Sequence, residues 1–93
     1  MNIRLMNDYT VELPLWVDDG LMDENALALA AELEAGLRAW AANFNQGFTV
    51  DGGWPSAQVE LAHRAEAERL LTELQRALPE HTITLAYWEN RHA

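Results

Sequence analysis

The sequence predicts an α+β fold of two layers, in which a helical hairpin packs on an antiparallel sheet formed by the N- and C-terminal strands. Two observations lead to this prediction. Apolar and polar residues alternate at both ends of the chain, and two segments between these ends repeat apolar residues every three or four positions. Alternation is typical of a strand with one buried face, and the longer spacing is typical of an amphipathic helix. No linker divides the 93 residues, so we expect one domain, residues 1–93.

The first predicted strand runs from Ile3 to Leu13, where the odd positions are mainly apolar. Asn7 and Asp8 interrupt the alternation, so we expect a bend or bulge there. Pro14 has no amide proton and should end the strand or leave it at a sheet edge. We expect these features to give one long strand with a break near its middle.

Trp16 follows Pro14 closely and precedes the turn-forming run Asp18-Asp19-Gly20. We interpret Trp16 as a cover over one end of the core, because large aromatic side chains mostly serve packing. The alternative is that Trp16 lines a binding groove.

The first predicted helix runs from Asp23 to Phe44, roughly six turns. Asp23 stands where a capping carboxylate can accept hydrogen bonds from the first turn. Gly47 lies where the left-handed conformation that closes a helix is tolerated. The apolar stripe of this helix comprises Ala26, Leu29, Ala30, Leu33, Leu37, Trp40 and Phe44.

The segment from Asn45 to Pro55 reads as a loop. Phe48 to Val50 inside it is either a short third strand or a set of apolar anchors. The pair Gly52 and Gly53 can adopt backbone angles closed to other residues, so the loop can turn sharply beside Trp54. A small-molecule site, if present, is expected here.

The second helix is predicted to begin after Ser56, a good N-cap residue, and to end before Pro79. Opposite charges three and four positions apart indicate a solvated outer face. The apolar stripe comprises Val59, Ala62, Ala67, Leu70, Leu71, Leu74 and Leu78. The C-terminal strand is predicted from His81 to Trp88. Unpaired edges of the two terminal strands and exposed Trp88 would allow a homodimer through edge pairing.

The chain carries 15 acidic and 6 basic residues, a formal charge of −9. Because nucleic-acid affinity comes largely from cationic side chains, no nucleic-acid partner is expected. The acidic surface either attracts a basic protein or only keeps the chain soluble. The chain has no cysteine, no apolar run long enough for a membrane span and no signal peptide, so a cytoplasmic protein without membrane partners is expected.

His63 has Glu60 three positions before it and Glu66 three after it, one fragment of a carboxylate-bridged di-metal motif. The fragment occurs once, and we interpret His63 as a boundary histidine with local ion pairs. Acidic residues near Asp23 do not have the spacing of a calcium loop. No hydrolase, phosphate-binding or dinucleotide motif is present. We therefore predict no catalytic residue, no metal ligand and no cofactor.

Short motifs across most of the chain resemble a set of small uncharacterised proteins from GC-rich actinobacteria. The motifs are Asp8-Tyr9 with Pro14-Leu15-Trp16, Leu37-x-x-Trp40-Ala41, and Gly53-Trp54-Pro55-Ser56 before Arg69-Leu70. An aromatic residue often stands at the position of His63 in that set, which implies a packing role. The resemblance carries over no activity and no site residue.

The sequence thus predicts a small acidic non-enzymatic protein that acts by contact with itself or with another protein, as a regulator, an antitoxin or an immunity-type partner. The alternative is a small-ligand or metal-binding module with a pocket between Trp16 and the Gly52-Gly53-Trp54 loop. The candidate surface residues are Trp16, Gly52, Gly53, Trp54 and Trp88.

Overall fold

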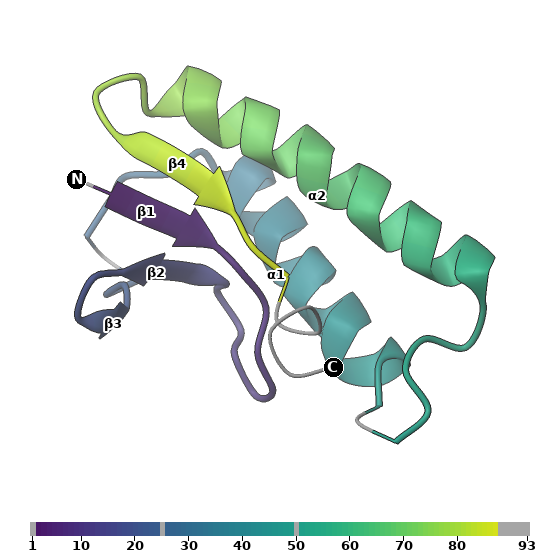
Figure 1. Cartoon of the computed structure of the whole chain (residues 1–93). Helices are drawn as coiled ribbons and strands as arrows, with labels where there is room; N and C mark the ends of the chain where they lie inside the picture. The colour runs from purple at the N-terminus through teal and green to yellow at the C-terminus, as the bar shows by residue number, and fades with distance from the viewer. Residues whose placement is uncertain (1, 25, 50, 88–93) are drawn as a thin grey trace.

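The computed structural model describes residues 2–24, 26–49 and 51–87. Two helices lie side by side over one face of a four-stranded sheet, and α2 runs back along α1 (Figure 1). The predicted two-layer α+β class is confirmed. The elements are β1 (Asn2–Leu5), β2 (Leu15–Val17), β3 (Gly20–Leu21), α1 (Ala31–Gly47), α2 (Ala57–Ala77) and β4 (Thr82–Leu85).

The terminal strands are neighbours, as predicted, but they run parallel rather than antiparallel. The sheet order is β3-β2-β1-β4, and Ile3 of β1 lies beside Ile83 of β4. The antiparallel prediction was wrong because β2 reverses the chain once more before the helical hairpin begins. This extra reversal also places β1 inside the sheet, so the edges are β3 and β4.

The segment from Ile3 to Leu13 is not one strand. β1 ends at Leu5, at the interruption seen in the sequence, and a loop returns the chain to β2 just after Pro14. Thr10 in this loop has a positive φ of 67°. The Asn45 side chain holds the loop, because its Oδ1 accepts from the Thr10 amide at 3.0 Å and its Nδ2 donates to the Val11 carbonyl. The loop is therefore fixed by a contact with α1 that lies far away in sequence.

The first helix begins at Ala31 and not at Asp23. Ala30 occupies the N-cap position without a side-chain hydrogen bond. Met22 is buried and its amide donates to the Leu15 carbonyl, so the chain is still attached to the sheet where the helix was expected to start. Further on, Leu27 and Leu29 pack on the core without forming helix. The helix continues past the predicted end at Phe44 to Gly47, and Phe48, in an extended conformation, is its C-cap. Gly47 is the last helical residue and does not adopt the predicted left-handed conformation.

The second helix follows the prediction closely. Ser56 is the N-cap, and its hydroxyl accepts from the Val59 amide at 3.1 Å. The helix ends at Ala77, two residues before Pro79. The predicted ion pairs Glu60–Arg64, Glu66–Arg69 and Glu73–Arg76 form on the outer face.

Replacing Ser56 with Ala is expected to lower the free energy of unfolding by about 1 kcal/mol, because the first-turn amide of Val59 loses its acceptor. Urea denaturation of both proteins measures the difference. Ser56→Asp is the matched control, since aspartate also caps, and its stability should stay close to that of the wild type. Equal losses in the two variants would contradict the capping role.

The hydrophobic core lies between the helices and the inner face of the sheet. Eleven buried residues form one cluster: Ile3, Leu5, Leu13, Leu15, Met22, Leu37, Trp40, Ala67, Leu70, Leu74 and Ile83. The strands contribute alternate residues and the helices contribute the middle of their predicted stripes. Among the described residues no helix is long and apolar enough to cross a membrane.

The described residues of the loop between the helices add no strand to the sheet. An isolated bridge joins Thr49 to Gly53, and Val50 lies outside the described residues. Phe48 acts as an anchor, since its ring stacks on that of Phe44 with centroids 5.3 Å apart. β2 and β3 extend the sheet instead. The C-terminal strand is shorter than predicted, Thr82–Leu85, and Trp88 lies outside the described residues.

Candidate functional site

An aromatic cluster gathers around His63, where α1 and α2 approach the loop that joins them. We define this aromatic cluster as Trp40, Phe44, Phe48, Trp54 and His63. The imidazole stacks on the Trp40 ring at 4.8 Å with 14° between the planes, and the Trp54 ring lies 4.5 Å away. His63 is only 3% exposed. The histidine therefore faces the interior between the helices, as part of the packing.

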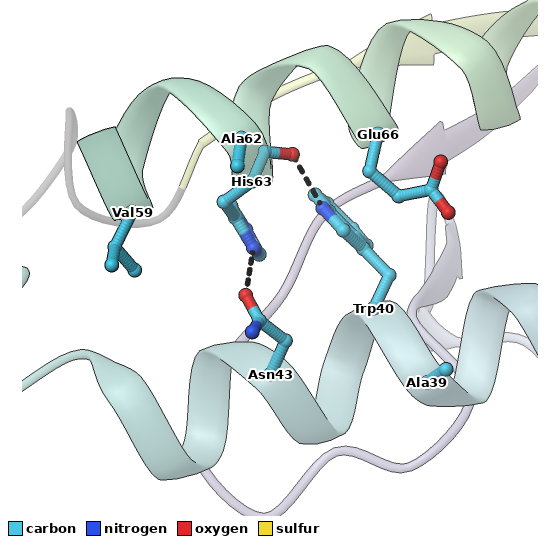
Figure 2. A pocket seen from close by; sticks show the side chains of 7 residues that line it. All are labelled: Ala39, Trp40, Asn43, Val59, Ala62, His63 and Glu66. Atoms are coloured by element: carbon cyan, nitrogen blue, oxygen red, sulfur yellow. Dashed lines mark hydrogen bonds between the residues drawn. The ribbon is translucent and has the colours of Figure 1, made fainter.

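Both ring nitrogens of His63 have amide partners. Nδ1 lies 2.8 Å from Oδ1 of Asn43, and Nε2 lies 3.2 Å from Nδ2 of Asn7. With the amides in these orientations, Nδ1 carries the proton and donates to Asn43, while Nε2 accepts from Asn7. The Trp40 indole donates to the backbone carbonyl of His63 at 3.0 Å (Figure 2). The histidine thus joins α1, α2 and the loop after β1.

Burial, together with the smaller effect of the nearby Arg64 charge, lowers the pKa of His63 from 6.5 to about 4. The imidazole is consequently neutral at pH 7. A neutral ring matches the two hydrogen bonds, which need one donor and one acceptor. A general base needs an accessible lone pair, but the lone pair on Nε2 of His63 already accepts a hydrogen bond from Asn7.

An open groove of about 460 Å³ runs along the helix pair beside this histidine. Its walls are Ala39, Trp40, Asn43, Val59, Ala62, His63 and Glu66, from both helices (Figure 2). The Arg69 guanidinium donates to Glu66 at 2.6 Å and lowers the pKa of that carboxyl. Glu60 pairs with Arg64. The carboxylates of the E-x-x-H fragment are therefore engaged by arginines, and the described residues contain no group of three or more metal-ligating side chains.

Trp16 lies in β2 and is half-buried on the face of the sheet opposite the helices. Its indole donates to the Met6 carbonyl at 2.7 Å. The Arg4 guanidinium lies 5.8 Å from the centre of its ring. Trp16 does not cover an end of the core, because Leu15 and Val17, its neighbours in the strand, point inward to the core.

Trp54 belongs to the aromatic cluster and fixes the loop between the helices. A Cβ added at Gly47 would stand 3.1 Å from the Trp54 ring, so α1 and Trp54 are in close contact. Gly53 has a φ of 68°, which favours glycine, and the Gly52 amide donates to the Thr49 hydroxyl. These glycines shape a turn that closes over the end of the helices.

The structure does not bring Trp16 and the Gly52-Gly53-Trp54 loop together. β2 and the loop joining the helices lie at opposite ends of the molecule (Figure 1). The groove described above is lined by neither Trp16 nor residues 52–54. Trp88 lies outside the described residues.

Arg4 is a residue that sequence reasoning missed. Of the five described arginines, four pair with carboxylates: Arg38, Arg64, Arg69 and Arg76. Arg4 has no such pair among the described residues, and its Nε is buried without a hydrogen-bond partner. Its place in the strand alternation was visible in the sequence, but its lack of a carboxylate depends on which strands lie beside it.

Comparison with family models matches residues 1–90 to a family described as Serratia CdiI immunity protein-like. Comparison with curated proteins finds no match. The family match covers every element described above, from β1 to β4.

Proposed function

The chain belongs to the Serratia CdiI immunity protein-like family, and from this membership we propose that it binds a protein toxin and blocks the toxin by contact rather than by catalysis. The family match over residues 1–90 is the observation that carries the proposal. It favours the immunity-type role among the contact functions that the sequence predicts.

The chemistry of the described residues supports action by binding. His63 is buried, neutral at pH 7 and hydrogen-bonded through both nitrogens. Glu66, the acidic residue among those that line the groove, is held by Arg69. A general acid or base must reach the proton that it transfers, and neither side chain is free to do so.

The charge of the chain indicates the chemistry of the partner. With a net charge of −9, the surface attracts a basic protein and speeds its approach by long-range electrostatic steering. Asp18 and Asp19, two of the described acidic residues outside these arginine pairs, are exposed. We therefore propose a basic toxin, met by this protein in the cytoplasm.

A test uses the proteins encoded by the genes flanking the gene of this chain. We expect one of them to arrest growth when expressed alone and to be tolerated when this chain is co-expressed. Calorimetry with the purified pair should show one-to-one binding. Stopped-flow mixing should show an association rate that falls by about tenfold or more when salt is raised from low to high concentration. If no flanking product is toxic, or a toxic one does not bind, the proposal is contradicted.

Homodimerisation through strand edges stays a prediction, but the edge strands are β3 and β4 rather than the two terminal strands. β1 is paired on both sides, so only β3 and β4 offer free edges among the described strands. β3 has two residues and β4 has four, which leaves little backbone for pairing. Sedimentation at high micromolar concentration decides between monomer and dimer.

A further inference from the structure

We propose that the toxin docks on the open face of the sheet, the face that the helices do not cover. This inference rests on the proposed function, since it names the surface through which the toxin is bound. Strand register defines the open sheet face. Arg4 lies opposite Trp16 and Thr84, Trp16 lies opposite Leu21, and Asn2 lies opposite Thr82. These six residues lie on one side of the sheet. In β1, Ile3 and Leu5 alternate with Asn2 and Arg4 and are buried against the helices, so Asn2, Arg4 and the residues opposite them face away from the helices.

The open sheet face differs in composition from the rest of this acidic chain. None of its six residues is acidic, although the chain contains 15 acidic residues. Leu21 is 52% exposed, and the half-buried indole of Trp16 lies between Leu21 and Arg4. Tryptophan and arginine are the residue types that most often dominate binding energy at protein interfaces. The outer face of α2, by contrast, is covered with glutamate–arginine pairs that already satisfy each other.

Arg4 supplies the observation that calls for a partner. Arg4 is half-buried, its guanidinium lies over the Trp16 ring, and no carboxylate of the described residues pairs with it. Hydrogen bonds to a charged group are stronger than neutral ones, so an acceptor of the toxin that pairs with this guanidinium would stabilise the complex. A carboxylate or a backbone carbonyl of the toxin fits this donor.

Acidic residues at the border of the open sheet face indicate the charge of the toxin surface that surrounds the acceptor. Asp18 and Asp19 form the exposed turn between β2 and β3, next to Trp16 and Leu21. A partner that covers the face would place its own border against these carboxylates. The complementary surface is therefore basic at its border, with an acceptor and apolar side chains at its centre. The basic toxin of the proposed function has this chemistry.

The test compares matched substitutions on the two faces of the molecule. Arg4→Glu and Leu21→Glu change the open sheet face. Arg76→Glu and Leu61→Glu make the same changes on α2, where Leu61 is 67% exposed and the Arg76 side chain is 76% exposed. The probe is the toxin encoded by the flanking gene, with binding measured by calorimetry and folding checked by thermal unfolding. Arg4→Gln and Leu21→Ala serve as milder variants if a glutamate variant fails to fold.

We expect the sheet-face variants to bind the toxin on the order of 30-fold more weakly, and the α2 variants to bind within about threefold of the wild type. If the wild type binds and the sheet-face variants bind as tightly, the docking inference is overturned while the proposed function stands. If Leu61→Glu or Arg76→Glu abolishes binding instead, the toxin uses the helical face. A sheet-face substitution that splits a homodimer without weakening toxin binding assigns the face to a second copy of this chain and also overturns the inference. Failure of the wild type to bind contradicts the proposed function itself.

Discussion

Replacing Phe44 with Ala is expected to lower the free energy of unfolding by about 3–5 kcal/mol. Phe44 has no exposed surface. Its ring centroid lies 5.4 Å from that of Tyr9 and 5.3 Å from that of Phe48, and the Trp54 ring meets it edge-on at 6.1 Å. The loop after β1, α1 and the loop between the helices all converge on this ring, so removing it leaves a cavity that rigid neighbours cannot fill.

Urea denaturation at pH 7 measures the Phe44 effect. The matched control is Phe48→Ala, which removes the same ring from a half-buried position in the same aromatic cluster and should lower stability clearly less. Phe44→Leu keeps most of the volume and should lower stability by about 1.5 kcal/mol or less. A loss below about 1 kcal/mol for Phe44→Ala would mean that this end of the core is loosely packed in solution.

The stability of the protein is expected to fall as the pH drops from 6.5 to 4, with His63 as a main cause. Folding lowers the pKa of His63 to about 4, because burial disfavours the charged imidazolium. Between these two pH values the unfolded chain binds a proton at His63 and the folded chain does not, so stability rises with pH across this window. The contribution is fully present above pH 6.5 and is lost on acidification, and it amounts to at most on the order of 3 kcal/mol.

Denaturation curves collected at several values between pH 4 and pH 7 test this prediction against His63→Phe. Phenylalanine keeps a flat ring next to Trp40 and Trp54 but has no titratable group, so its stability should depend less steeply on pH. The difference between the two slopes isolates His63, because carboxylates such as that of Glu66 titrate in both proteins. Equal slopes would show that His63 is not responsible. An NMR titration of the imidazole gives the pKa directly and should place it well below 6.

Trp16 and Trp54, which the sequence analysis joined in one candidate pocket, have different surroundings in the structure. Trp54 was predicted to lie beside a sharply turning loop where a small-molecule site, if present, was expected, and in the structure its ring packs against Gly47 and His63. Trp16, predicted as a cover for the core with a binding groove as the alternative, lies on the open sheet face beside Arg4. Of the candidate residues that the structure describes, only Trp16 therefore belongs to the surface that we propose for the toxin. The resemblance to the actinobacterial set stays a prediction.

The sequence by itself determined the features that depend on near neighbours along the chain. The cap of Ser56, the end of α2 before Pro79 and the ion pairs on its outer face join residues at most four positions apart, so spacing alone predicts them. The two-layer class also follows from the alternating and helical patterns.

Tertiary structure alone decided the features that join distant residues. Asn45 holds the loop at Thr10 across 35 positions, and Asn7 reaches His63 across 56. The short strand β2 reverses the chain, makes the terminal strands parallel and brings Trp16 opposite Arg4. A three-residue strand has too few positions to show an alternation of its own, and its partner is chosen by the packing of the whole sheet. The position of Arg4 on the open sheet face, without a carboxylate partner among the described residues, is therefore a property of the fold. The local sequence pattern does not show which side chains the fold brings close to Arg4.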